Sequence, residues 1–375
     1  MGRWPRHVFI SFVAGSTLIG GSALAADPIV IADQMVAALT DGTRTASYEA
    51  ATEADGVVTI IGFDVLDEPN GIIATVAEIV VVNPIERETG FVAEVIRLSG
   101  GEISDEANIV RWDLVELTNV IIPPLADLGA DAGPEIPLTA VEIERVFFDP
   151  PQANEVVIDG VTLQLGEVVE GVPYSIAVTI DGIEVPTDAA DNSDPFAILR
   201  DMGFEGLTMD LDVVGTYDSE NDTLVADSIG INIRDFGSLQ VAGVFSGLPL
   251  SLLQEPGGID LLLASAMVEL VTIRFENNGA MEAFMRIQAE MMGIAAEDAA
   301  PALAVAFQIL LGAFDNPQLA QQVGVAVGVF LRDPQSITIV AAPEEPVPLL
   351  AIIPLIVSDP NGLPTLLDVV VTAND

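Results

Sequence analysis

The stretch from Leu207 to Phe245, LTMDLDVVGTYDSENDTLVADSIGINIRDFGSLQVAGVF, decides the fold. Apolar and polar residues alternate along three runs, and the polar loops 218–222 and 235–237 separate the runs. The apolar positions are Leu207, Met209, Leu211, Val213 and Tyr217 in the first run, Val225, Ile229, Ile231 and Ile233 in the second, and Leu239, Val241 and Phe245 in the third. A period of two, interrupted by tight polar loops, predicts three antiparallel strands with one dry face and one wet face.

The same pattern extends to both sides of this stretch. From Arg44 to Val185 the chain is rich in Val, Ile and Thr, with turn dipeptides such as Asp55-Gly56, Asp159-Gly160 and Asp181-Gly182, and Met267–Phe275 repeats the pattern. Helix starts are predicted where Asp or Asn precedes Pro: at Asp27-Pro28, Asp194-Pro195, Asn316-Pro317 and Asp359-Pro360.

A helical part begins at Asn277. Met281, Phe284, Met285 and Ile287 form a stripe at helical spacing, and Pro301–Phe314 and Pro317–Leu331 are predicted as further helices. After these come a strand at Ser336–Val340, short helices at Pro346–Val357 and Pro360–Leu367, and a strand at Asp368–Thr372. The sequence therefore predicts an α+β fold: a long, curved, mostly antiparallel meander with helices packed on its dry face, chiefly those of a helical insertion at 277–332.

Composition shifts divide the chain into six predicted segments. They are a signal peptide at 1–25, an N-terminal helix and meander at 26–122, a Pro/Gly-rich joint at 123–137, a central sheet at 138–276, a helical subdomain at 277–332, and a C-terminal strand–helix–strand at 333–375.

The first 25 residues have the organisation of a cleavable export signal. Arg3, Arg6 and His7 precede the apolar run Val8–Ile19, and Ala23-Leu24-Ala25 offers small residues for cleavage before Ala26. We therefore expect an exported protein of the periplasm of a Gram-negative bacterium. No later apolar run has the ~20 residues that a spanning helix needs, so no integral membrane span is expected after cleavage.

The charge excludes one class of partner. The chain has 57 acidic and 12 basic residues, a formal net charge of −45 and no Lys. Such a surface repels nucleic-acid phosphates, so nucleic acid is not expected as a partner. The mean hydropathy of +0.52 is high for so acidic a chain, and an apolar ligand or partner would account for it.

Most catalytic chemistry is excluded as well. The chain has no Cys and a single His, which lies in the predicted signal peptide. Ser-His-Asp and Cys-His catalysis, zinc sites of His and Cys, and phosphate-binding or Schiff-base lysines are therefore ruled out for the mature chain. No catalytic residue is assigned, and an acid pair acting as a glycoside-type hydrolase is the enzyme class that the composition leaves open.

Calcium is the one metal that the residues allow, because calcium needs only oxygen ligands. Asp218, Glu220 and Asp222 occupy alternate positions of one acidic loop, and a second loop holds Asp188, Asp191, Asn192 and Asp194. Thr223 stands where a calcium loop has its Gly, and Ile229 where it has its closing Glu. Asp and Asn also form turns and helix caps, so a purely structural role for both loops stays open.

An apolar ligand site is predicted where the Met stripe meets the dry face of the sheet. Its candidate residues are Met281, Phe284 and Met285 on the helix and Met209 and Leu211 on the first strand. Methionine side chains adapt to apolar ligands of different shape. Ordinary packing between helix and sheet would produce the same stripe, and both interpretations stay open.

Several short segments together resemble a known group of proteins. The segments include Asp33-Gln34-Met35-Val36, Ser47-Tyr48-Glu49, Asp235-Phe236-Gly237-Ser238-Leu239, the run from Phe330 to Thr338, Pro346-Val347-Pro348-Leu349 and the ending from Leu367 to Asn374. Their order resembles uncharacterised exported proteins of alphaproteobacteria, carried as a domain of unknown function. The resemblance implies export and a sheet-plus-helices chain, and it brings no activity or catalytic residues.

Three functional hypotheses follow. The first is a non-enzymatic periplasmic protein that binds a lipid or acyl chain, or an envelope partner, on the dry face. The second is a structural or assembly scaffold that binds proteins only. The third is a carboxylate-based hydrolase or a calcium-binding protein.

Overall fold

A computed structural model describes the chain from residue 27 to residue 375 with internal gaps. Outside the description lie 1–26, 41–42, 68–69, 88–89, 106–107, 123–137, 150–154, 170–171, 187–199, 201, 205, 251, 253–256, 312–315 and 360. The predicted signal peptide, the Pro/Gly-rich joint, the helix start at Asp194-Pro195 and the acidic loop of Asp188–Asp194 therefore lie outside the described residues.

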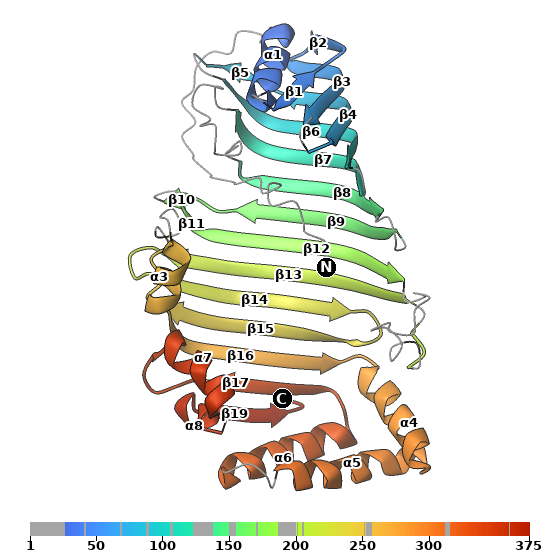
Figure 1. The fold of residues 1–375 in the computed structure, drawn as a ribbon, viewed down its shortest axis with the longest axis vertical. Coiled ribbons are helices and arrows are strands. Elements are labelled where there is room, and N and C mark those ends of the chain that lie inside the picture. Colours follow the sequence, from blue (N-terminus) through green and yellow to red (C-terminus); the bar gives the residue numbers. More distant parts are fainter. Residues whose placement is uncertain are drawn as a thin grey trace. The chain divides into compact units, whose positions relative to one another are not determined.

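The described residues form an α+β fold of antiparallel meanders and seven helices, as predicted (Figure 1). The chain divides into two compact units, Met1–Ile183 and Glu184–Asp375, here called unit 1 and unit 2. Strand β12, Ser175–Pro186, crosses this division.

Unit 1 consists of one helix and a meander. Helix α1 spans Pro28–Leu39. The strands are β1 Arg44–Ser47, β2 Ala50–Ala54, β3 Val57–Asp67, β4 Ile72–Val82, β5 Ile85–Glu86, β6 Phe91–Ser104, β7 Ile109–Ile122, β8 Ala140–Asp149 and β9 Val156–Leu165, with the small ladder β10 Val168–Val169 and β11 Val172–Pro173. Strands β1 and β2 pair with successive segments of β3, and pairing then proceeds through β4, β6, β7 and β8 to β9.

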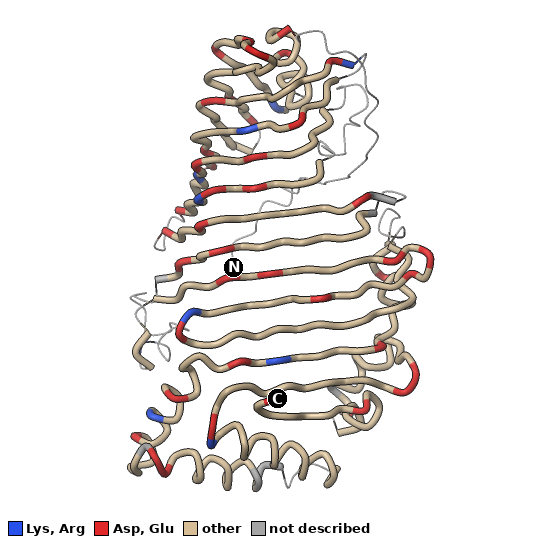
Figure 2. Tube along the Cα trace, turned by 180° about the vertical axis from the view of Figure 1, so that it is seen from behind, with Lys and Arg blue, Asp and Glu red and all other residues tan. Residues whose placement is uncertain are grey.

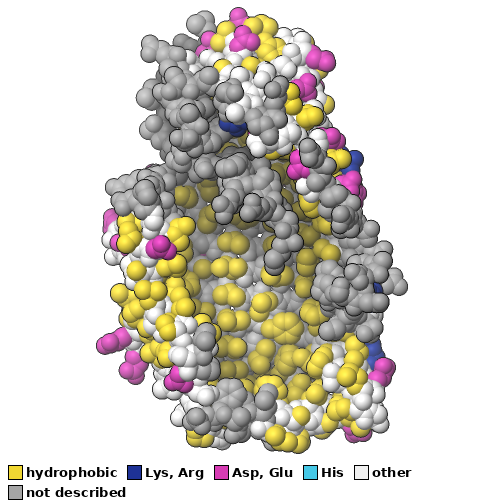
Figure 3. Space-filling model, viewed as in Figure 1, with side chains coloured by type: hydrophobic (Ala, Val, Ile, Leu, Met, Phe, Trp, Pro, Cys, Tyr) yellow, Lys and Arg dark blue, Asp and Glu magenta, His cyan; other side chains and the backbone are white. Residues whose placement is uncertain are grey.

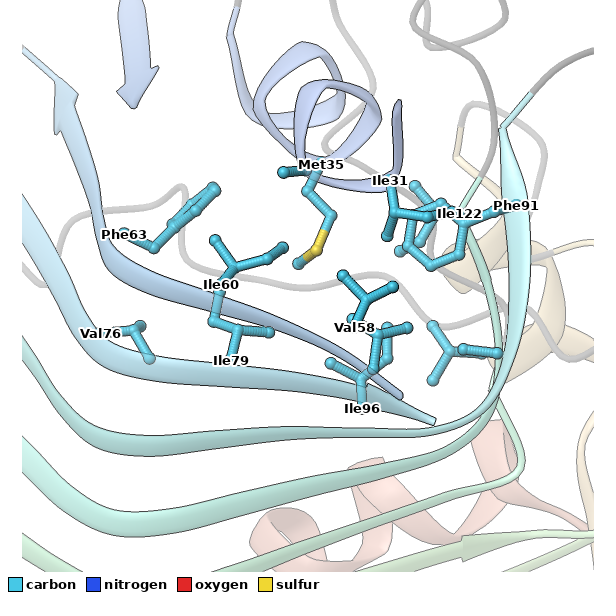
Figure 4. Close-up of a cluster of buried hydrophobic side chains, with 14 of the residues drawn as sticks. Ile31, Met35, Val58, Ile60, Phe63, Val76, Ile79, Phe91, Ile96 and Ile122 are labelled. Atoms are coloured by element: carbon cyan, nitrogen blue, oxygen red, sulfur yellow. The ribbon is translucent and has the colours of Figure 1, made fainter. Parts of the chain in front are cut away.

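Helix α1 fills the interior of unit 1. The Asp27 carboxylate accepts a hydrogen bond from the amide of Ile29 at 2.9 Å, and Pro28 occupies the first turn, as the sequence predicts. Ile31 and Met35 point from α1 onto the side chains of Ile60 and its neighbours on the sheet (Figure 4). The alternating apolar face of this sheet is therefore buried under its own helix.

Gly101 on β6 leaves room for Trp112 on β7, the largest side chain of this strand pair. Gly101 lies opposite Trp112, and the indole occupies the space where a side chain of residue 101 would lie. A Cβ atom on Gly101 would lie 1.9 Å from Cζ2 of Trp112. Only glycine leaves room for this ring, so the backbone of β6 forms part of the packing surface.

Unit 2 contains a second meander with six helices. Its strands are β13 Gly206–Asp218, β14 Thr223–Ile233, β15 Gly237–Ser246, β16 Met267–Asn277, β17 Ser336–Ala341, β18 Val347–Pro348 and β19 Val369–Ala373. Its helices are α3 Gly258–Ser265, α4 Ala280–Met292, α5 Ala296–Leu311, α6 Pro317–Arg332, α7 Leu349–Ser358 and α8 Leu363–Leu366. Strand order is β13-β14-β15-β16-β17-β19, and β18 pairs with the start of β16.

The three predicted strands and both loops between them are confirmed as β13, β14 and β15. Helix α6 is confirmed with its predicted cap, since the Asn316 side chain accepts from the amide of Leu319 at 3.0 Å. Helix α5 begins at Ala296, before the predicted Pro301, because two acids favour its first turn and Pro301 is accommodated inside it. Asp359 ends α7 instead of starting a helix, and its carboxylate accepts from the amide of Gly362 at 3.2 Å.

Candidate functional site: the apolar face of unit 2

One face of the unit 2 sheet is apolar from strand to strand. Register places the side chains in two cross-strand rows, one of Val213, Ile229, Val241, Ile273, Ile339 and Val371, and one of Leu211, Ile231, Leu239, Phe275, Ile337 and Ala373. We call the part of these rows on β13–β17 the apolar face. The dry face that the alternation predicts is therefore continuous across five strands.

The middle of the apolar face is not covered. Side chains at its centre retain 36–46% of their accessible surface, namely Val213, Ile229, Ile231, Leu239, Ile273 and Ile339. Buried apolar residues of the same strands lie toward the strand ends, at Leu207, Tyr217, Ala226, Val268 and Ala341. A contiguous exposed apolar patch on a folded protein marks a binding surface.

Helices flank this face on three sides (Figures 1 and 3). At one strand end, α3 and α7 lie together, and the amide of Leu349 donates to the carbonyl of Ala266 at 2.8 Å. Helix α4 lies at the opposite strand end, and α6 lies beside β19 and β17. In Figure 3 the apolar side chains of the sheet occupy a hollow next to the rim that α3 and α7 form.

Asn277 and a backbone hydrogen bond fasten helix α4 to the end of the sheet. Asn277 ends β16, its carbonyl oxygen Oδ1 accepts from the amide of Met281 at 2.8 Å, and its Nδ2 donates to Glu282 at 2.8 Å and to the carbonyl of Pro334 at 2.9 Å. The amide of Ala280 donates to the carbonyl of Phe236 at 3.0 Å. These bonds start α4 at the sheet's end, so α4 does not lie across the apolar face.

The predicted ligand residues therefore occupy two different places. Leu211 belongs to the apolar face, and Met209 lies one row further toward the α4 end, in register with Ile233. Met281 and Met285 are half-buried on α4, and Phe284 is 40% exposed. The helices reach the apolar face on the β19 side, where the rings of Phe275 and Phe330 meet edge to face with centroids 6.2 Å apart.

The opposite face of the same sheet carries hydrogen-bonded polar side chains, together with the exposed side chains of Val214 and Leu270. Ser228 donates to the carboxylate of Asp212 and accepts from the side-chain amide of Gln240 at 3.1 Å. Arg274 lies further along this face, bonded to Glu276 at 2.9 Å and to Thr338 at 3.1 Å. In Figure 2, which views the molecule from this side, acidic positions recur along the strands and the few basic positions of unit 2 lie on β16 or toward the α4 end.

The loop of Asp218, Glu220 and Asp222 forms the β13–β14 turn. Both carboxylate oxygens of Asp218 are used inside it, by the amide of Glu220 at 2.9 Å and by the side-chain amide of Asn221 at 2.7 Å. The Asn221 hydrogen bond is the first cause that lowers the pKa of Asp218. Asp222 accepts from the hydroxyl of Tyr217 at 3.1 Å. These bonds account for the carboxylates of Asp218 and Asp222 by turn formation.

The described residues bring together no group of three or more acidic side chains that could hold a metal ion. The structure therefore adds no support to the hypothesis that Asp218, Glu220 and Asp222 bind calcium, and it stays a prediction.

Within the described part of the chain, no helix combines the length and apolarity that crossing a membrane requires.

A protein-family model described as an uncharacterized protein matches residues 230–374. The match covers β15 to β19 and most of the apolar face, and it includes several of the segments that carry the resemblance noted above. No curated protein matches the chain.

One element of the site was missed from the sequence. Helix α3 contributes to the rim of the apolar face, and its residues Ile259, Leu261 and Leu263 are exposed. The pair Gly257-Gly258 followed by three leucines was the available signal. An eight-residue helix gives too short a period to be distinguished from a strand.

Proposed function

We propose that unit 2 is a carrier that holds an apolar chain, the aliphatic part of a lipid or similar amphiphile, on its apolar face. The observation that supports this most directly is the exposure of aliphatic side chains in the middle of a sheet whose buried apolar residues lie toward the strand ends. The side chains are branched aliphatics without a polar atom, and they fit a ligand that makes dispersion contacts and forms no hydrogen bonds.

The dimensions of the face suit such a ligand. The apolar rows cross five strands, β13 to β17, so four strand spacings of ~4.8 Å give a length of ~19 Å. That length is comparable with an extended long acyl chain. The rows run at right angles to the strands, so a linear chain lying along one row would contact an aliphatic side chain at every strand.

Burial of these side chains supplies a driving force of the right size. Fully burying a Val, Leu or Ile side chain is worth about 1.5–3 kcal/mol. Because about 40% of each side chain at the centre is still exposed, covering one contributes roughly 1 kcal/mol. Six such side chains offer roughly 6 kcal/mol, and burial of the ligand's own CH₂ groups, at about 0.8 kcal/mol each, adds to this against the entropy cost of association.

Export to the periplasm belongs to the same proposal. It is supported by the N-terminal segment with Arg3, Arg6 and the run Val8–Ile19, and by the resemblance to exported alphaproteobacterial proteins. A carrier outside the cytoplasm would shield acyl chains from water between membranes. The large excess of acids would keep it soluble while its apolar face is empty.

The test is native mass spectrometry of the full-length protein after gentle purification from the periplasm of its own host. We expect a mass adduct that organic extraction releases as a lipid or fatty acid. The delipidated protein should then bind a fluorescent fatty acid with one saturable site. A clean mass together with no saturable fatty-acid binding would overturn the proposal.

A further inference from the structure

A second apolar surface of unit 2 lies outside the apolar face. Helices α3 and α7 contact each other, and each turns large aliphatic side chains toward solvent. The exposed residues of this α3–α7 ridge are Ile259, Leu261, Leu263, Leu350, Ile353 and Ile356, which retain 39–64% of their surface. Two neighbouring helices with outward aliphatic side chains form a surface on which a third helix can pack, because the side-chain ridges of one helix fit into the grooves of another.

The surroundings of the ridge carry one sign of charge. Four exposed carboxylates flank it, those of Asp260, Glu344, Glu345 and Asp359. The five Arg residues of unit 2 lie elsewhere, on β16, before β13, at the β14–β15 turn, on α4 and at the end of α6. Figure 2 shows the same separation of acidic from basic residues: at the α3–α7 end of the unit 2 strands the charged positions are red, which marks Asp and Glu. In Figure 3 the ridge appears as yellow side chains with magenta acids around them.

This charge selects between the possible occupants of the ridge. A second copy of the chain would place its own acids against the four carboxylates, and the two sets would repel each other. An anionic membrane surface would also repel the carboxylates. An apolar surface with an acidic rim is complementary to an apolar surface with a basic rim. The rim charges would also accelerate encounter with a basic partner, over a Debye length of about 8 Å at physiological salt.

We propose that the α3–α7 ridge docks a basic amphipathic helix of a partner protein. The aliphatic side chains of that helix cover the ridge, and its Lys and Arg residues face the four carboxylates. Helices of eight and ten residues are ~12 and ~15 Å long, so the partner helix contacts the ridge over two to three turns. This inference uses a surface separate from the apolar face and does not depend on lipid binding there.

The test uses two synthetic 16-residue peptides with the same Leu face, one with Lys and one with Glu at every polar position. Each carries a fluorescent label, and anisotropy is measured with the full-length protein. We expect the Lys peptide to bind at least about tenfold more tightly than the Glu peptide at low salt. The double variant Leu261→Gln with Ile353→Gln should weaken the Lys peptide at least about tenfold, since it removes apolar contact and leaves every charge in place.

Two further variants make the result decisive. Glu344→Gln with Glu345→Gln should weaken the Lys peptide and flatten its salt dependence, while the apolar-face variant Ile231→Ser should leave its affinity unchanged. If the Lys peptide binds the Leu261/Ile353 variant as it binds the wild type, the attraction is non-specific and the proposal is wrong. If neither peptide binds but vesicles of neutral phosphatidylcholine retain the wild type and release that variant, the ridge contacts a membrane surface and the proposal is equally wrong.

Discussion

Truncating the centre of the apolar face should remove lipid binding without unfolding the protein. The perturbation is the triple variant Ile229→Ser, Ile231→Ser and Leu239→Ser. These side chains are neighbours on β14 and β15, and Ile231 lies directly opposite Leu239. They are 46%, 41% and 41% exposed in the free protein, so a ligand rather than the fold would complete their burial.

The expected loss follows from that exposed fraction. Covering about 40% of a side chain worth about 1.5–3 kcal/mol when fully buried contributes about 0.6–1.2 kcal/mol per residue. Three such residues contribute about 2–4 kcal/mol. Since each 1.4 kcal/mol is a factor of ten, the affinity for a long-chain fatty acid should fall about 20- to 400-fold. The assay is fluorescence titration of the delipidated protein with a polyene fatty acid.

Unit 1 provides a matched control. Ile73, Ile85 and Leu66 have the same residue types and 47%, 41% and 39% exposure, and they lie on β4, β5 and β3. The same three substitutions there remove the same kind of partly exposed surface. Both triple variants should lose a similar part of their unfolding free energy, and only the unit 2 variant should lose affinity. Equal affinities of the two variants and the wild type would refute the assignment of the ligand to the apolar face.

Three local predictions test the structure itself. Gly101→Ala should cost about 1–3 kcal/mol of unfolding free energy in urea because its Cβ collides with the indole, and the cost should shrink in a Trp112→Ala background. Asn277→Ala should lower the unfolding free energy by about 1–2 kcal/mol through loss of the α4 cap, as measured by thermal melting. The hydrogen bond to Asp33 is the first cause that raises the pKa of Tyr48, so its stabilisation is complete below the unfolded pKa of about 10 and lost as pH rises through the folded pKa. The stability difference between wild type and Tyr48→Phe should therefore vanish in strong alkali, and an unchanged difference would contradict the bond.

The strands and the polarity of their faces were predictable because a period of two is a local property. Alternation from Leu211 to Val241 determines which side chains share a face once the two turns are in place. The register confirms that assignment except at Val225, which a register shift between Ala226 and Ile229 places on the opposite face. The helix starts at Pro28 and Pro317 were predictable for the same reason, since a capping side chain and its proline are adjacent in sequence.

Whether a helix covers the apolar face was not predictable, because it depends on contacts between residues far apart in sequence. The Met281–Met285 stripe shows that α4 has an apolar side, and nothing local determines which surface that side meets. The hydrogen bonds from Asn277 to Pro334 and from Ala280 to Phe236 determine where α4 lies. They join residues that are 44 or more positions apart in sequence. The acidic loop was ambiguous in a different way, since turn formation and calcium binding call for the same residue types.

The two units show that an open face is a matter of helix placement and not of composition. Both sheets alternate aliphatic and polar residues with the same period. In unit 1, α1 lies across the sheet and its Ile31 and Met35 meet Ile60, so the dry face becomes a core. In unit 2, helix α4 begins next to Asn277 at the end of the sheet, and the centre of the apolar face stays exposed. The same chain thus contains one apolar sheet face that a helix covers and another that stays exposed. This contrast supports the proposal that a ligand occupies the exposed face.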